Sequence, residues 1–197
     1  LEELGFPGGE GVTNNVPRGV TLTIEPGVVV FMGKGETFSV EGVLKAKGTA
    51  EEPIVFTHAQ CNESWGDLYF VGEESSESEL EYVTLQYAGE GIKTQNAFPK
   101  SIKHSVFRKV GLDGINAYLF NGSYPALELV GNSITQGSGV AVKLTIAENA
   151  SVPSITFREN EISFFYGSAF IIEGDGGEIV NPPDTIIFEH NIFEKGY

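Results

Sequence analysis

Lysine, tyrosine and amide side chains recur in this sequence beside one column of apolar residues, and together they could bind a carbohydrate. If that column faces a core, its polar neighbours face outward, and they are Lys45, Lys47, Tyr69, Lys93, Gln95, Asn116, Tyr118 and Lys143. Tyrosine rings can stack on sugar rings, while lysine and amide groups hydrogen-bond hydroxyls or carboxylates. The alternative is that exposed strand positions favour tyrosine and tolerate lysine without any ligand.

Two carboxylates near these positions are candidates for acid–base chemistry. Asp67 and Asp113 flank the repeat that contains Gly91, which predicts a separation of roughly 10 Å. A glycoside hydrolase needs two facing carboxylates about 5 to 10 Å apart. Asp next to Gly is also common in simple turns. The sequence therefore leaves an enzyme open and favours a protein without catalysis.

Residues that commonly bind metals form no recognisable site. His104 and His190 have the same offset in their repeats, but three repeats predict roughly 14 Å between them, and His58 stands alone. Two acidic stretches, GEESSESELE (72–81) and EGDGGE (173–178), offer oxygen ligands for Ca²⁺ without matching a known calcium-loop spacing. We therefore expect no cofactor, with Ca²⁺ as the open alternative.

Three N-x-S triplets are candidate N-glycosylation sites, at Asn62, Asn121 and Asn149. Each falls in a predicted corner or loop between repeats, where a glycan could project into solvent. The prediction applies only to a protein that passes through a eukaryotic secretory route, since the triplets carry no meaning in a bacterial protein.

Composition limits the class of protein. A chain of 197 residues with 41% hydrophobic content suits one domain with a substantial core. A net charge of −15 argues against nucleic acid as a partner, because its phosphates require a basic surface. No apolar run reaches the roughly 18 to 20 residues of a membrane span. The single Cys61 excludes an internal disulfide.

Short strands must position the candidate residues. From Gly19 to His58 apolar segments alternate with Pro-Gly, Gly-Lys-Gly and Gly-Thr corners, and no helical period is present. Three apolar columns then recur about every 24 residues. They are Leu22, Leu44, Leu68, Ile92, Ile115, Val140, Phe170; Ile54, Phe56, Leu80, Ile102, Leu129, Phe157, Phe188; and Phe38, Cys61, Leu85, Phe107, Ile134, Ile162, Phe193. This pattern predicts an all-β, single-stranded right-handed parallel β-helix of about seven coils and three sheets.

One polar column supports the same fold. The segments LELVGNSI, ITFRENEI and IIFEHNIF place Asn132, Asn160 and Asn191 at equal offsets, with Val83 and Ser105 in the equivalent earlier places. Asn tolerates left-handed backbone at a corner, and its amide can bond to the like residue one coil away. We predict a stacked asparagine ladder; three unrelated turn asparagines are the alternative.

The pattern also predicts the domain limits. Residues 1–18 carry turn signals and scattered apolar residues, as expected for an irregular N-terminal cap, and residues 19–197 form the β-helix. The last segment, EKGY, contains no polar cap, which repeat arrays require. We therefore expect a β-helix cut from a longer chain that has further domains.

Four segments resemble one large group of proteins. TLTIEPGVVVF, GVLKAKGTAEEPIVFT, WGDLYF and SELEYVTLQYAGEGI are similar to secreted and cell-surface right-handed parallel β-helix repeat proteins of the pectate-lyase-like superfamily, over roughly residues 19–197. That group includes adhesins, surface-layer and junction proteins, and polysaccharide lyases and hydrolases that hold substrates on a comparable sheet. The resemblance specifies a fold but not an activity.

From this resemblance we expect a non-catalytic extracellular module that acts as a rigid structural or adhesion element. Its partners would be other extracellular or surface proteins, or glycans. The alternative is a polysaccharide-binding or polysaccharide-degrading domain that uses the face rich in lysine and tyrosine.

Overall fold

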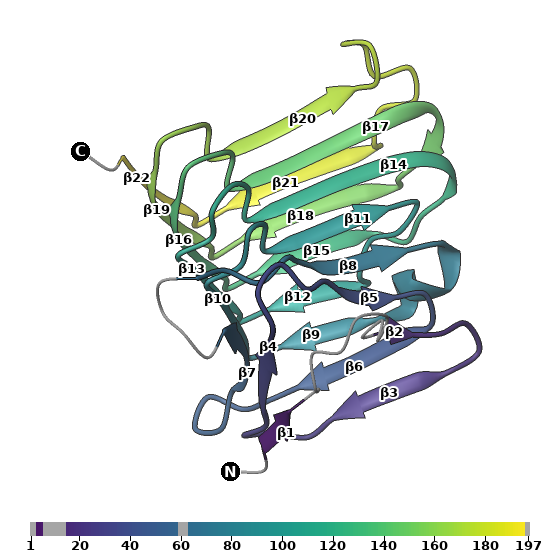
Figure 1. Cartoon of the computed structure of the whole chain (residues 1–197). Helices are drawn as coiled ribbons and strands as arrows, with labels where there is room; N and C mark the ends of the chain where they lie inside the picture. Colours follow the sequence, from purple (N-terminus) through teal and green to yellow (C-terminus); the bar gives the residue numbers. More distant parts are fainter. Residues whose placement is uncertain (1–2, 6–14, 59–62, 196–197) are drawn as a thin grey trace.

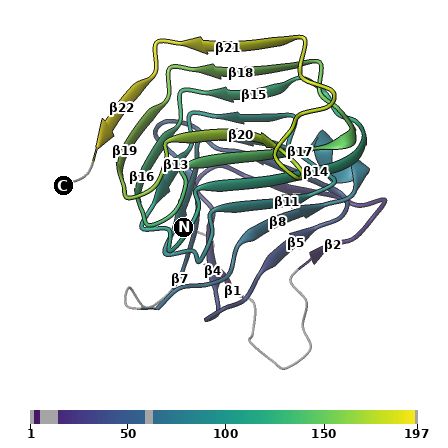
Figure 2. The ribbon, with the colours of Figure 1, turned by 90° about the horizontal axis from the view of Figure 1, so that it is seen from above.

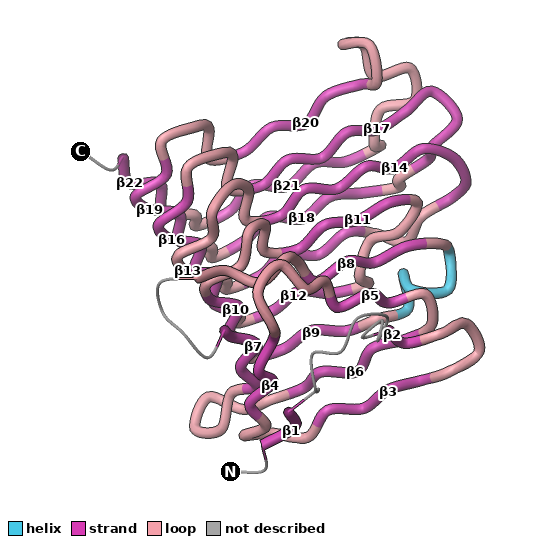
Figure 3. The backbone as a smooth tube through the Cα atoms, in the orientation of Figure 1, coloured by secondary structure: helices cyan, strands magenta, loops and turns pink. Residues whose placement is uncertain are grey.

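The computed structural model describes residues 3–5, 15–58 and 63–195, and they form an all-β parallel solenoid of right-handed type. It has about six turns, close to the seven coils predicted. Strands and loops account for almost the whole tube in Figure 3, and the one helical segment of the described residues is the 3-10 helix η1 (Glu73–Glu77). The predicted fold class is confirmed.

Three parallel sheets form the walls of the solenoid (Figures 1 and 2). Sheet A contains β1 (Glu3–Gly5), β4 (Val29–Met32), β7 (Ile54–His58), β10 (Val83–Gln86), β13 (Val106–Arg108), β16 (Ser133–Gly137), β19 (Glu161–Phe165) and β22 (Ile192–Lys195). Sheet B contains β2 (Asn15–Val16), β5 (Phe38–Val40), β8 (Leu68–Val71), β11 (Ile92–Gln95), β14 (Ile115–Ser123), β17 (Val142–Ser151) and β20 (Phe170–Gly174). Sheet C contains β3 (Thr21–Ile24), β6 (Val43–Lys47), β9 (Glu79–Glu81), β12 (Ser101–Lys103), β15 (Leu127–Val130), β18 (Ser154–Arg158) and β21 (Thr185–Glu189).

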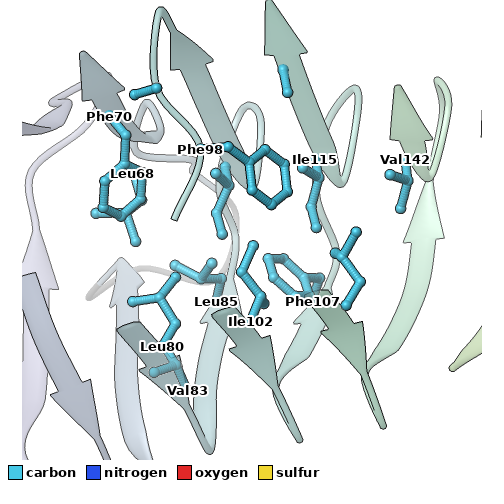
Figure 4. Close-up of a cluster of buried hydrophobic side chains, with 14 of the residues drawn as sticks. Leu68, Phe70, Leu80, Val83, Leu85, Phe98, Ile102, Phe107, Ile115 and Val142 are labelled. Carbon is cyan, nitrogen blue, oxygen red and sulfur yellow. The ribbon is translucent and has the colours of Figure 1, made fainter. Parts of the chain in front are cut away.

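Alternate residues of each strand point into a continuous apolar core. In sheet B, Leu68, Ile92, Ile115 and Val142 stack in register and are fully buried. Figure 4 shows members of this column opposite Leu80, Ile102 and Phe107 from the other two walls. Because inward positions are apolar, the remaining alternate positions face solvent and carry the polar residues.

The predicted columns are correct in the later coils, except at Val140, and wrong in the early ones. Leu22 and Leu44 pair with each other in sheet C, not with Leu68 of sheet B. Ile54 and Phe56 belong to sheet A, and Phe38 belongs to sheet B. Val142, rather than Val140, follows Ile115 in register. Cys61 lies outside the described residues.

The early errors have a structural cause. A full turn from Lys45 of β6 ends at Glu79 of β9, which is 34 residues further along the chain. The helix η1 and the segment between β7 and β8 lengthen this turn. A step of 24 residues from Leu44 of sheet C therefore reaches Leu68 of sheet B instead of the next strand of sheet C.

The asparagine ladder is confirmed at the corner between sheets C and A. The Asn132 backbone N–H and side-chain amide both donate to Asn160 Oδ1, at 2.9 and 3.0 Å. Asn160 donates to Asn191 Oδ1 in the same two ways, at 2.9 and 3.1 Å. Ser105 continues the ladder, because its N–H donates to Asn132 Oδ1 and its hydroxyl accepts from Val83 N–H. We call this column the Asn corner.

Left-handed backbone at the Asn corner lies one residue earlier than predicted. Positive φ angles occur at Tyr82, His104, Gly131, Glu159 and His190, each directly before a ladder position. The asparagines themselves have ordinary φ angles, so their side chains are free to cross between coils. The ladder residue is selected for its hydrogen bonds rather than for its backbone conformation.

The first residues of the chain are more regular than the irregular cap predicted for them, and the last described coil leaves part of the core exposed. Within residues 1–18, β1 and β2 are strands that pair with β4 and β5; residues 1–2 and 6–14 lie outside the description. In the last described coil, the inward-facing Phe188 and Phe193 remain 47% and 50% exposed. Both pack against Phe157, at ring distances of 5.5 and 6.3 Å.

Candidate functional site

The outer face of sheet B brings together six of the eight residues predicted to bind a ligand. Tyr69, Lys93, Asn116 and Lys143 lie in one row across β8, β11, β14 and β17. Gln95 and Tyr118 lie in a second row two residues further along the strands. We call these residues, together with Phe120, the sheet B face. Their spacing along four successive coils suits an extended ligand.

Lys45 and Lys47 do not belong to this face, which corrects the prediction. Both lie on β6 of sheet C, where they pair with Glu79 of β9; Lys45 Nζ is 2.6 Å from Glu79 Oε1, and Lys47 binds Oε2. Hydrogen bonds from Lys45 and Lys47 lower the pKa of Glu79 to about 2, and the bond to Glu79 raises the pKa of Lys47. These lysines form an ion-paired cluster, so they are not available to a ligand of sheet B.

The two lysines that do lie on the sheet B face also have acidic partners. Lys93 Nζ is 3.8 Å from Glu90 Oε2, and Lys143 Nζ is 3.0 Å from Glu173 Oε1. Each pair brings opposite charges together at a partly exposed position, so the face carries little excess positive charge. It differs in this respect from a surface built to attract a polyanion.

A stack of carboxylates at the entry to sheet B contains a residue that the sequence reasoning missed. Glu90 precedes β11 and lies between Asp67, before β8, and Asp113, before β14. Its side chain is only 16% exposed. Burial raises the pKa of Glu90; Lys93 opposes this, while the charges of Asp67 and Asp113 add to it. The structure thus places a protonatable carboxyl group in the coil between the two predicted aspartates.

The three acidic residues differ in how well they are satisfied. Asp113 Oδ1 accepts a hydrogen bond from Val140 N–H at 2.6 Å, which gives it a structural role at a turn. Asp67 Oδ1 and Glu90 Oε2 are buried oxygens without a hydrogen bond to protein. Glu90 could have been found from sequence, because Gly89 and Gly91 flank it at the place where Asp67 and Asp113 adjoin glycines.

Aromatic side chains form the far edge of the sheet B face. The rings of Tyr118 and Phe120 stack at 6.2 Å, and the Phe120 side chain is 49% exposed. Tyr118 Oη donates to Asp175 Oδ2 at 2.8 Å, and this bond raises the pKa of Tyr118. Tyr69 Oη donates to Gln95 Oε1. Phe120 was not predicted, although it is the next outward position after Asn116 and Tyr118.

Two of the three glycosylation triplets lie side by side. Asn121 pairs in register with Asn149, and Ser123 pairs with Ser151. Both asparagines are exposed and lie on strands β14 and β17 where these wrap around a corner. Asn62 lies outside the described residues. Glycosylation of Asn121 and Asn149 stays a prediction.

The two acidic stretches are engaged in protein contacts. In the first, Glu74 accepts from Gly19 N–H at 2.9 Å and Glu79 binds the two lysines of β6. In the second, Glu173 and Asp175 bind Lys143 and Tyr118. Across residues 3–5, 15–58 and 63–195, no three His, Cys, Asp or Glu residues are grouped to hold a metal ion.

His104 and His58 contact different neighbours and do not form a shared site. His104 stacks on Tyr82 at 5.1 Å on the outside of the Asn corner. His58 Nε2 lies 3.9 Å from Glu63 Oε2.

In the part of the chain that the structure describes, no helix has the length and apolar character needed to span a membrane.

Comparison with family models, with curated proteins and with solved structures finds no significant match for this chain. The geometry of the site therefore carries the functional argument alone.

Proposed function

We propose that the chain is a non-catalytic β-helix module of a secreted or cell-surface protein, acting as a rigid structural or adhesion element. Its contact surface is the sheet B face. The observation that carries this proposal is a row of outward side chains, Tyr69, Lys93, Asn116 and Lys143, in register over four coils. Gln95, Tyr118 and Phe120 lie beside this row on β11 and β14. Such side chains offer stacking and hydrogen bonding without a catalytic group of their own.

The rod itself supports an architectural role. Parallel pairing joins each described coil to the next in all three sheets, and the Asn corner adds hydrogen bonds that cross between coils. A stack of this kind resists bending and holds surface residues at fixed spacing. We propose that it belongs with the pectate-lyase-like superfamily, on the sequence segments that resemble that group, and we expect surface proteins or glycans as partners.

A binding screen tests the proposal. The purified chain is applied to a glycan array and to immobilised extracellular proteins, beside Lys93→Ala, Tyr118→Ala and a Lys103→Ala control on sheet C. We expect binding that the two sheet B variants weaken and the control leaves intact. Equal loss in all three variants, or no binding to any glycan or protein, would remove the sheet B face as the contact surface.

A polysaccharide-degrading enzyme is the second candidate, and Glu90 is the observation that favours it. A partly buried carboxyl group whose pKa is raised by burial, in the coil between two other carboxylates, has the character of a general acid. Turnover assays on neutral, acidic and amino polysaccharides test this role. Turnover that Glu90→Gln abolishes would establish an enzyme and overturn the non-catalytic proposal, whereas no turnover on any of them would remove the candidate.

The paired triplets at Asn121 and Asn149 support glycosylation as part of the proposal for a secreted protein. Mass measurement of the native protein before and after N-glycosidase treatment tests it. An unchanged mass would exclude N-linked glycans at these positions.

A further inference from the structure

A small pocket adjoins the aromatic edge of the sheet B face. It has a volume of about 220 Å³, and its lining residues come from β14, β17 and the segment that follows β20. Six of its lining residues are Phe120, Glu148, Asn149, Asp175, Glu178 and Val180. Pockets for drug-sized ligands measure roughly 300 to 1,000 Å³, so this one suits a single sugar ring.

The loop that closes the pocket is held in place by three hydrogen bonds to two earlier coils. Asp175 accepts from Tyr118 Oη, and its own N–H donates to the Ile146 carbonyl at 3.3 Å. Asn181 Nδ2 donates to the Glu148 carbonyl at 2.5 Å. The pocket wall is thus tied to β14 and β17, and its lining residues keep fixed positions relative to Phe120.

The lining of the pocket combines one type of charge with apolar surface. Phe120 and Val180 are 49% and 59% exposed, which leaves two apolar surfaces open to solvent. Glu148, Asp175 and Glu178 are exposed carboxylates around the same space, and Asn149 adds an amide. An aromatic face accepts the C–H side of a sugar ring or a cation, and the carboxylates attract positive charge.

The lysines of the sheet B face do not offset this negative charge. Lys93 and Lys143 are already paired with Glu90 and Glu173, and the whole chain carries a net charge of −15. A polyuronate would therefore meet a surface of its own sign at this end of the face. A glycan with protonated amines would meet complementary charge.

We propose that this pocket binds an amino-sugar unit, so that the ligand of the sheet B face is a glucosamine-containing polysaccharide rather than a polyuronate. The proposal rests on the proposed glycan contact of that face and names its ligand class. The sugar ring packs on Phe120, its ammonium group lies among the three carboxylates, and neighbouring units extend over Tyr118 towards Tyr69.

Because Asn149 lines the pocket, a glycan on this residue would obstruct it, and the pocket is open to a ligand only where Asn149 carries none. Calorimetric titration of the unglycosylated protein with three matched oligosaccharides tests the proposal. The probes are a β-1,4-linked glucosamine hexamer, its fully N-acetylated counterpart and a galacturonate hexamer, at about pH 6, where the carboxylates are ionised. The variants are Phe120→Ala and the pair Asp175→Asn with Glu178→Gln. Glu51→Gln with Glu52→Gln removes the same charge from an exposed turn far from the pocket.

We expect the glucosamine hexamer to bind at least about tenfold more tightly than either other probe, and more weakly as salt rises. Asp175→Asn with Glu178→Gln weakens this binding about tenfold, Phe120→Ala does so comparably, and the Glu51 and Glu52 control pair leaves it within about twofold. Asparagine at 175 still accepts the Tyr118 hydrogen bond, so loss of binding reports on charge.

Three outcomes overturn the inference in distinguishable ways. Equal or tighter binding of the N-acetylated or galacturonate hexamer would refute the amino-sugar assignment and leave a glycan-binding sheet B face intact. If none of the three probes binds while the array screen finds another ligand, the amino-sugar assignment fails and the adhesion role stands. If the screen also finds nothing, both fail.

Discussion

The outer faces of sheets B and C have the same parallel backbone pairing but carry different kinds of side chain. On sheet C, lysine side chains meet glutamates of the next coil, as in Lys45 with Glu79 and Lys103 with Glu128, both at 2.6 Å. On sheet B, aromatic rings and amides stand in those rows, and a buried carboxyl oxygen of Glu90 lacks a hydrogen bond. Charged pairs thus dominate the outer face of sheet C, whereas sheet B combines two such pairs, Lys93–Glu90 and Lys143–Glu173, with partly exposed aromatic and amide side chains.

At the Asn corner, next to sheet C, polar side chains also bond to residues of neighbouring coils. Each described asparagine of the Asn corner donates to a backbone carbonyl and bonds with its neighbour in the ladder. Where polar groups satisfy each other, the residues contribute to stability and leave little for a partner. This difference is why we assign binding to sheet B.

The largest expected effect on stability is at the Asn corner, next to sheet C, for the variant Asn160→Ala. The Asn160 side chain is buried and bonds to Asn132, Asn191 and the Leu129 carbonyl, so truncation leaves several buried groups without partners. We expect a loss of about 3 kcal/mol in the free energy of unfolding, measured with urea. The exposed Asn149→Ala is the control and should change stability by less than about 0.5 kcal/mol. A similar small change for Asn160→Ala would contradict the ladder.

A smaller effect is expected for Glu79→Gln on sheet C, with a defined pH dependence. Lys45 and Lys47 lower the pKa of Glu79 in the folded state to about 2, so its stabilisation is present above the usual glutamate pKa. It is lost as the pH falls from about 4.5 towards 2. We expect Glu79→Gln to cost about 1 kcal/mol at pH 7, after allowance for solvent screening.

Urea unfolding of wild type and Glu79→Gln at descending pH checks this expectation. The two stability curves should approach each other only in strong acid. A constant difference across the whole range would show that packing, rather than the two lysines, accounts for the loss.

Glu90→Gln on sheet B should act in the opposite direction. Burial raises the pKa of Glu90, so its folded-state contribution is favourable below the usual glutamate pKa and is lost as the pH rises through the raised value. At pH 7 the charged form is disfavoured, and removing the charge should increase stability by up to about 1 kcal/mol. The same titration series measures it, and the gain should disappear in acid. Destabilisation at pH 7 would mean that Glu90 is better paired than its surroundings indicate.

The solenoid could be predicted from sequence because the same pattern of apolar residues recurs in every coil. Apolar residues about 24 apart have one simple explanation in a chain without a helical period, and Asn132, Asn160 and Asn191 marked one corner in three consecutive coils. The early coils were assigned to the wrong walls because the turn from β6 to β9 is longer than the repeat. This error alone moved Lys45 and Lys47 from sheet C to the candidate site.

The rest of the site depended on contacts that spacing does not encode. Glu90 acquires its properties from burial beside Asp67 and Asp113, which are distant in sequence. Asp175 reaches Tyr118 across 57 residues through a loop that folds back over the sheet. Outward positions follow from strand alternation, but their ion pairs require the three-dimensional register. Lys93 and Lys143 therefore looked like ligand-binding cations until their glutamate partners were placed.

One comparison of variants tests the difference between the two faces most directly. A ligand found in the binding screen is titrated into wild type, into Tyr69→Ala with Tyr118→Ala on sheet B, and into Lys103→Ala with Glu128→Ala on sheet C. Each double variant removes two outward side chains from its sheet. We predict at least about a tenfold loss of affinity for the sheet B variant and less than a twofold change for the sheet C variant. The reverse order would contradict the assignment of the sheet B face as the contact surface.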